Sequence, residues 1–371
     1  MCSGRRRRRC PRPTCSPTTT PSGAASGLRA RETPKDKKRR QEKAVTTSPN
    51  IITRRDFVAF AAALSLLPSA YSQTSYPSRP VQLNHGFGAG GNADVVSRLL
   101  AQKMQDKLGQ PVVVEIKSGA GGLIATDFVA KARPDGYNIV MLTGAHTVSA
   151  ALRRKLPYEP VNDFAFISTV TSFPFVIAVR ADHPARNLAE LIATARQKPG
   201  QVTFTSVGVG STQHMVGELL GVSAGAKLLH VPYRGGGAPV QAVIGGDVDV
   251  LADTLTVAMP HIQSGRLRAL AVTSAQPWPS MPEVPVVASV LKGFEIRSWL
   301  GIAAPHDTPP NVIEVLGRSA RSALDDPGVK TTLTTLGSEA APSTPAQMKS
   351  MVEREIGRWS EVVAKAGIPQ Q

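Results

Sequence analysis

Short apolar runs alternate with amphipathic stretches over the first part of the chain body. The apolar runs have the length of buried strands, and the stretches between them repeat apolar residues at helical spacing. Strict alternation of this kind is typical of a parallel sheet with helices on both faces. The pattern predicts strands at 80–84, 112–115 and 137–142, and helices at 93–108 and 123–132.

A second alternating series follows two apolar runs at 164–170 and 173–179. A strand at 294–304 is expected to return to the first sheet, and helices at 309–324 and 345–366 close the chain. The fold class is therefore α/β with two Rossmann-like α/β domains, the first formed by 73–172 plus 297–371 and the second by 173–296. The second series comprises helices at 188–197, 212–224, 238–244 and 255–264, and strands at 202–205, 228–231, 248–252 and 269–273.

A glycine-rich turn at 86–94 joins the first predicted strand to the first helix. Such a turn leaves backbone N–H groups pointing into one cavity, with the positive end of the helix dipole behind them. Glycine permits positive φ and lets a ligand approach the backbone. The turn is therefore expected to bind an anion.

Two further stretches, 206–212 and 233–238, repeat this chemistry in the second domain. If each domain presents one loop to a shared cleft, a small anion is held from both sides, and closure expels water. Arg234 is a candidate counter-charge, with an ordinary surface arginine as the alternative. Two-sided capture favours a binding protein over an enzyme.

The formal charge of +16 is concentrated at the N-terminus. Residues 1–72 hold 16 Lys and Arg against 4 Asp and Glu, so the remaining 27 basic and 23 acidic residues give 73–371 a net charge of only +4. A body this weakly basic argues against a nucleic-acid partner. All three cysteines (Cys2, Cys10, Cys15) lie in the leader, which excludes disulfides and thiolate metal sites from the body.

The leader divides into two parts. Residues 1–50 have few large apolar residues and are expected to be a disordered basic extension produced by a misassigned start, with Val45 near the true start. Residues 51–72 contain Arg54-Arg55 followed by the apolar run 58–67 and small residues, which predicts a twin-arginine export signal. The mature protein is then expected in the periplasm.

One rival interpretation is a dinucleotide-dependent oxidoreductase, since Gly86-x-Gly88-x-x-Gly91 matches the dinucleotide fingerprint and Glu115 follows at the next strand. Asp94 argues against it. At an effective dielectric near 20, like charges about 4 Å apart repel by roughly 4 kcal/mol, more than a helix terminus contributes to anion binding.

The remaining chemistry is sparse. His214 and Glu218 lie one helical turn apart and could form half of a metal site, but further ligands are missing nearby and a polar helix face is the alternative. The sequence shows no Walker lysine and no nucleophile paired with a base. No cofactor, metal or catalytic residue is predicted.

Over residues 76–371 the chain resembles the Bug-type periplasmic solute-binding receptors, the binding components of tripartite tricarboxylate transporters. In that family, prolines usually stand where this chain has Gly86 and Gly88. The motifs that carry the resemblance are Tyr76-Pro77-Ser78-Arg79-Pro80, Gly90-Gly91-Asn92-Ala93-Asp94, Gly119-Ala120-Gly121-Gly122, Pro134-Asp135-Gly136-Tyr137, His230-Val231-Pro232-Tyr233-Arg234-Gly235, Pro260-His261-Ile262 and Leu267-Arg268-Ala269-Leu270-Ala271-Val272-Thr273.

The resemblance implies a Venus-flytrap, periplasmic-binding-protein fold that holds a small carboxylate in the cleft between two domains, for uptake or sensing. The expected ligand is a di- or tricarboxylate, an amino acid or an aromatic acid. It also implies permease subunits in the membrane as partners, and we expect a monomer. The predicted ligand-binding residues are Phe87, Gly88, Ala89, Gly90, Asn92, Asp94, Thr143, His146, Ser206, Gly208, Gly210, Ser211, Thr212, His214, Tyr233, Arg234 and Asp253.

Overall fold

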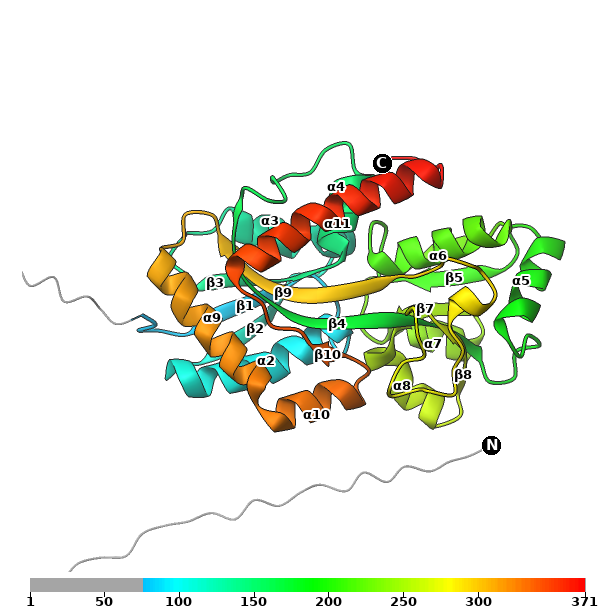
Figure 1. Cartoon of the computed structure of the whole chain (residues 1–371), viewed down its shortest axis with the longest axis horizontal. Coiled ribbons are helices and arrows are strands. Elements are labelled where there is room, and N and C mark those ends of the chain that lie inside the picture. Colours follow the sequence, from blue (N-terminus) through cyan, green and yellow to red (C-terminus); the bar gives the residue numbers. More distant parts are fainter. Residues whose placement is uncertain (1–75, 371) are drawn as a thin grey trace, which may run out of the picture. The chain divides into compact units, whose positions relative to one another are not determined.

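A computed structural model describes residues 76–370 of the chain (Figure 1). The predicted basic extension and export signal lie outside these residues. Within them, the expected alternation of strands and helices is present. The strands are β1 Val81–His85, β2 Val112–Ile116, β3 Asn138–Thr143, β4 Phe164–Arg180, β5 Thr203–Ser206, β6 Leu229–Pro232, β7 Val250–Thr254, β8 Leu267–Val272, β9 Arg297–Pro305 and β10 Glu339–Ala340.

The α-helices connect these strands and pack on the faces of the sheet. Two short 3₁₀ turns, η1 Ala120–Gly122 and η2 Val287–Ser289, accompany them. The helices are α2 Asn92–Leu108, α3 Leu123–Ala130, α4 Ala145–Leu152, α5 Leu188–Gln197, α6 Thr212–Ala224, α7 Ala238–Gly245, α8 Leu255–Gln263, α9 Pro310–Asp325, α10 Pro327–Thr335 and α11 Pro345–Lys365.

One sheet carries both alternating series, in the order β2-β1-β3-β9-β4-β7-β5-β6. We call β1, β2, β3, β9 and the start of β4 with their helices the first lobe, and β5 to β8 with the end of β4 the second lobe. The parallel pairing expected in each series is present, since β1 pairs with β2 and β3, and β5 pairs with β6. The predicted return of the chain to the first sheet is confirmed by β9, which pairs with β3.

The sequence interpretation is wrong about the strands that join the lobes. The two apolar runs expected at 164–170 and 173–179 are one strand, β4, which pairs with β9 in the first lobe and with β7 and β8 in the second. Both β4 and β9 run antiparallel to their neighbours, so the sheet is mixed and not purely parallel. Figure 1 shows these two long strands extending from one lobe into the other. Helices α4 and α10 were also not expected.

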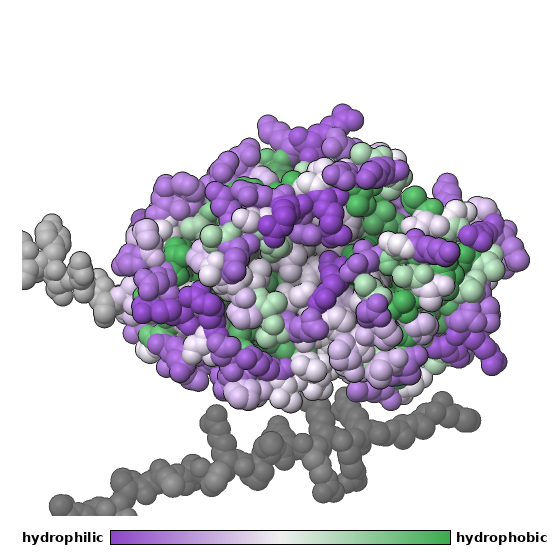
Figure 2. All heavy atoms as spheres, in the orientation of Figure 1, coloured by the Kyte–Doolittle hydropathy of each residue, from purple (hydrophilic) through white to green (hydrophobic). Residues whose placement is uncertain are grey.

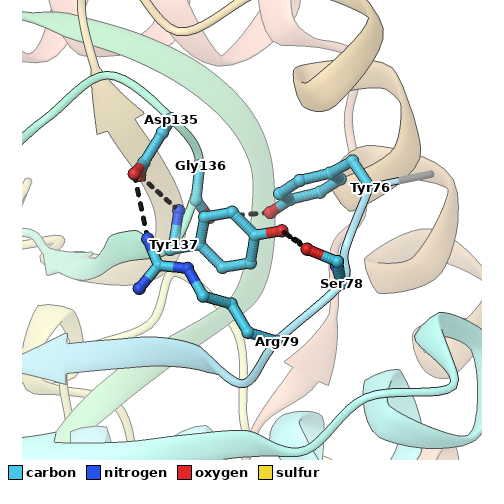
Figure 3. Close-up of polar contacts among 6 residues, drawn as sticks. All are labelled: Tyr76, Ser78, Arg79, Asp135, Gly136 and Tyr137. Carbon is cyan, nitrogen blue, oxygen red and sulfur yellow. Dashed lines mark hydrogen bonds and ion pairs between the residues drawn. The ribbon is translucent and has the colours of Figure 1, made fainter. Parts of the chain in front are cut away.

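A polar and aromatic cluster fixes the start of the described chain (Figure 3). The Tyr76 hydroxyl donates to the Gly136 carbonyl (2.7 Å), and the rings of Tyr76 and Tyr137 meet edge to face at 5.1 Å. Arg79 pairs with Asp135 (3.1 Å) and lies over the Tyr137 ring. The segment before β1 is thereby held against the turn that leads into β3.

The largest apolar cluster fills the space between the sheet and its helices. It includes the fully buried Leu83, Leu100, Ile139, Ile177 and Phe204. On the face drawn in Figure 2, polar and apolar side chains are interspersed. Within residues 76–370, no helix is both long enough and apolar enough to cross a bilayer.

Candidate functional site

A small cavity lies where three helices begin. Residues from the first turns of α2, α6 and α8 line it, together with residues of β4 and β9. Both lobes therefore contribute to one site. The lining residues are Phe87, Gly91, Asn92, Ala93, Thr143, Phe173, Phe175, Val207, Thr212, Gln213, Gly236, Asp253, Thr254, Val257, Ser298 and Leu300.

The three helix N-termini make the cavity attractive to an anion. Neither α2 nor α8 has a side-chain cap on its first N–H groups, and in α6 the Ser211 hydroxyl caps only the amide of His214. Unpaired N–H groups and the helix dipole both favour negative charge at this end. Since no Lys, Arg or His is among the described lining residues, backbone amides, hydroxyls and side-chain amides would have to hold it.

The first glycine turn is braced from within by Asp94. Its carboxylate is 4% exposed, accepts from the Gly90 N–H (2.9 Å) and from Arg98 Nε (2.8 Å), and lies 3.3 Å from His85 Nε2. Gly90 has a φ of +75°, which glycine adopts without strain. Asp94 and Gly90, both predicted to bind ligand, thus contact each other and do not line the cavity.

The second glycine loop has a similar internal brace. The Ser206 hydroxyl accepts from the Gly208 N–H (3.0 Å) and lies 2.6 Å from His230 Nε2, while the Gly210 N–H donates to His214 Nδ1 (3.4 Å). Burial, and secondarily the neighbouring His214, lower the pKa of His230 to about 4. Of the ligand contacts predicted in this loop, only Thr212 lines the cavity.

Across the whole prediction, the structure brings five residues to the cavity wall: Phe87, Asn92, Thr143, Thr212 and Asp253. The other predicted residues support the wall or lie elsewhere. Those outside the lining are Gly88, Ala89, Gly90, Asp94, His146, Ser206, Gly208, Gly210, Ser211, His214, Tyr233 and Arg234.

His146 and Arg234 differ most from their predicted roles. His146 is 4% exposed, its Nε2 lies 2.7 Å from the Pro160 carbonyl, and its ring stacks on Tyr158. Burial lowers its pKa to about 4, so the imidazole is neutral at physiological pH. Arg234 is exposed and does not supply the counter-charge at the cavity wall.

Sequence reasoning missed the floor of the cavity. The four residues of this floor come from β4 and β9 and are Phe173, Phe175, Ser298 and Leu300. The apolar runs that contain them indicate only that these segments are buried strands. Only the crossing of these strands between the lobes exposes them to the cavity. Gln213 directly follows the predicted residue Thr212 on α6. Its position in the first turn of the helix could therefore have identified it as a candidate cavity residue.

The lobes contact each other around the cavity. Gly88 and Gly235 form an isolated parallel β-bridge, the Thr256 hydroxyl donates to Asn92 Oδ1 (2.7 Å), and the Ser149 hydroxyl donates to the Gly210 carbonyl (3.3 Å). A Cβ at Gly91 would lie 3.2 Å from the Gly236 amide nitrogen. The glycines of the apparent dinucleotide fingerprint therefore serve close packing of backbone segments.

Among the residues that it describes, the structure adds no third ligand to the predicted half-site of His214 and Glu218. Their closest side-chain atoms are 3.6 Å apart. Among residues 76–370, no three or more His, Cys, Asp or Glu residues are grouped so that they could hold a metal ion.

Comparisons with known proteins identify the family of this chain. The family model for the tripartite tricarboxylate transporter family receptor matches residues 96–368. Protein BugT of Bordetella pertussis is 35% identical over 299 residues, which cover 80% of this chain and 92% of BugT.

Solved structures extend the likeness to the fold. The periplasmic binding protein BugD is 35% identical with a TM-score of 0.78 and is matched over 80% of this chain and 100% of its own. MatC from Rhodopseudomonas palustris with bound malate is 32% identical with a TM-score of 0.75, over 78% of this chain and 100% of its own. The predicted periplasmic-binding-protein fold is confirmed, and this chain belongs to the tripartite tricarboxylate transporter receptor family, whose members include the periplasmic Bug solute-binding proteins.

Proposed function

We propose that this protein captures a small carboxylate between its two lobes in the periplasm and presents it to a membrane permease or a sensor. The main support is the convergence of three helix N-termini on a cavity that has no Lys, Arg or His among its described lining residues. Oriented backbone amides suit a carboxylate because they supply positive potential and hydrogen bonds together. The relative MatC has malate bound, which is the same ligand chemistry.

The proposed mechanism is hinge closure of two domains, 73–172 plus 297–371 and 173–296. The strands β4 and β9 connect the lobes, and the contacts between Gly88 and Gly235 and between Asn92 and Thr256 would form as the lobes close. Ligand binding would favour the closed arrangement because only that arrangement brings residues of both lobes to the ligand. No catalytic step is part of the proposal.

Native mass spectrometry of the protein purified from the periplasm tests this function. We expect the native spectra to show a small carboxylate bound to the protein, and a denaturing solvent to release it. Adding the same carboxylate back to ligand-free protein should restore its thermal stability. A nanomolar dissociation constant corresponds to about −12 kcal/mol, and a ligand of that affinity stays mostly bound at micromolar protein concentration. A released nucleotide would instead support the oxidoreductase.

Export through the twin-arginine route is the second part of the proposal. Arg54-Arg55 and the apolar run after them support it, and residues 1–44 are expected to be dispensable. Replacing both arginines with lysine should leave the protein in the cytoplasm with its leader attached, whereas a chain started at position 45 should still be exported. Normal periplasmic recovery of the double-lysine variant would rule out this route.

A further inference from the structure

A surface hollow beside the strands that join the lobes has no part in the proposed function. Residues of β4, β9 and α11 line it, and it shares only Ser298 with the cavity between the lobes. Ser298 and Leu300 of β9 line that cavity, whereas the alternate residues Arg297 and Trp299 line the hollow. Because side chains alternate between the two faces of a strand, the hollow lies on the opposite face of the sheet.

Three polar atoms of the hollow are buried without a partner. Trp299 is 7% exposed and Thr171 is fully buried. Trp299 Nε1, Thr171 Oγ1 and Arg297 Nε form no hydrogen bond with any residue among 76–370. Indole and guanidinium nitrogens can only donate, and a buried donor without an acceptor destabilises the folded protein. Three such atoms in one hollow indicate an acceptor that comes from outside the chain.

Arg297 is held in place without the use of its Nε. Its Nη2 donates to Glu339 (2.7 Å), and its guanidinium carbon lies 5.0 Å from the centre of the Trp278 ring. These two contacts restrict the guanidinium before any ligand arrives. The Nε–H therefore remains available on the same face of β9 as Trp299.

The charges at the rim of the hollow nearly balance. Arg358 donates to both carboxylate oxygens of Glu355, each at 2.9 Å. Glu295, the other acidic residue among the described lining residues, is exposed, where water and salt screen its charge. The buried donors therefore decide which ligand fits. Hydrogen bonds to an ionised acceptor are about twice as strong as those to a neutral one, which favours an oxyanion over a neutral carbonyl group.

We propose that this hollow is a second binding site, which holds a small oxyanion such as a carboxylate or sulfate. Trp299 Nε1, Arg297 Nε and the Thr171 hydroxyl donate to its oxygens. The inference does not depend on the function proposed above, because the hollow and the cavity between the lobes lie on opposite faces of the sheet. Both sites can therefore be occupied at once.

The indole N–H resonances of the mature protein test this site. The protein has three tryptophans, so isotopic labelling of the indole nitrogens gives three signals, and Trp299→Phe identifies the one from position 299. Acetate and sulfate are titrated, with acetamide as the neutral match of acetate and sodium chloride as the control for ionic strength. We expect acetate and sulfate to shift the Trp299 signal in a saturable way. Acetamide and sodium chloride should leave it unchanged.

Two conservative variants test the other donors. Thr171→Val removes the hydroxyl at nearly constant volume, and Arg297→Lys retains the charge but removes the Nε–H. Each should raise the apparent dissociation constant of sulfate by about tenfold or more, since a hydrogen bond to a charged group contributes that much. Thr212→Val, which changes the cavity between the lobes, should leave this constant unchanged. The signals of Trp278 and Trp359 report whether each variant is folded.

Three outcomes would overturn the proposal. If no probe shifts the Trp299 signal in folded protein, the three donors bind water only. If acetamide shifts the signal at the same concentrations as acetate, the hollow accepts a neutral carbonyl group and the oxyanion class is wrong. If Thr212→Val removes the response while Thr171→Val and Arg297→Lys retain it, the shift arises from the cavity between the lobes.

Discussion

At the scale of single residues, two buried carboxylates have opposite environments. Asp94 accepts from a backbone amide and contacts Arg98, whereas Asp253 accepts from neutral groups only. The first stabilises the loop that carries it. The second lowers the folding stability of the ligand-free protein, and such a cost is common at residues that form a binding site.

This cost predicts that Asp253→Asn stabilises the ligand-free protein at high pH. The folded carboxyl has a pKa of about 6 against an ordinary value of 3.8, so the folded state binds the proton more tightly and loses stability as pH rises through this range. The variant should gain up to about 3 kcal/mol at pH 8 and nothing below about pH 4. Urea unfolding at both pH values, with Asp247→Asn as the control, measures this. A gain independent of pH would contradict the assignment.

His146 predicts a loss of stability in acid. Its pKa is about 4 in the folded protein and about 6.5 when unfolded, so the unfolded state takes up the proton first as pH falls from 6.5 to 4. Between pH 7.5 and 5 the unfolding free energy should fall by about 2 kcal/mol more in the wild type than in His146→Gln. Urea unfolding of the wild type and of His146→Gln at both pH values measures this, and an equal fall in the two proteins would contradict the assignment.

At the scale of elements, β4 and β9 determine how the lobes are joined. Each was predicted as a strand or as parts of one, since its apolar run is visible in the sequence. Their antiparallel pairing and their passage between the lobes depend on long-range partners. The N-terminal segment before β1 is likewise recognisable by its motif, but its hydrogen bonds to the turn before β3 appear only in three dimensions (Figure 3).

Tyr76→Phe should destabilise the protein by about 1 kcal/mol. The change removes the hydroxyl that donates to the Gly136 carbonyl and preserves the ring contact with Tyr137. Arg318→Ala, which removes an exposed ion pair on α9, should cost less than about 0.5 kcal/mol. Equal losses in the two variants would show that the hydroxyl contributes no more than a surface contact. Chemical denaturation of the mature protein measures both.

At the scale of the whole molecule, the proposed closure of the lobes depends on the glycine loops. A Cβ at Gly236 would lie 2.5 Å from the Ala89 carbonyl oxygen in the other lobe, and Gly236 has a φ of +70°. Gly265 has a φ of +69° with nothing within 4 Å of its Cβ position. Comparing an alanine at position 236 with an alanine at position 265 therefore separates the effect of local backbone strain from the effect of contact between the lobes.

Gly236→Ala and Gly265→Ala should each lose about 1 kcal/mol of stability, because alanine disfavours positive φ. Only Gly236→Ala should weaken binding of the carboxylate released from the purified protein, by about tenfold or more. Small-angle scattering at saturating ligand should show compaction of the wild type and of Gly265→Ala but not of Gly236→Ala. Compaction of all three would show that closure does not need this contact.

The sequence by itself determined the local features of this protein. The alternation of β1, α2, β2, α3 and β3 follows from apolar periodicity, and the glycine turns follow from residues that tolerate positive φ. These signals are local because they depend on neighbouring residues. The predicted glycine loops contain three residues of the cavity wall, Phe87, Asn92 and Thr212, whereas Thr143 and Asp253 were expected only with the resemblance to the receptor family.

Only the tertiary structure decided which groups in those loops remain available to a ligand. The Gly90 amide bonds to Asp94 and the Gly210 amide to His214, while Asp253 lies in the cavity wall. Phe173, Phe175, Ser298 and Leu300 reach the cavity because β4 and β9 cross between the lobes. Pairing between distant segments sets these facts, and no local pattern of residues specifies such pairing.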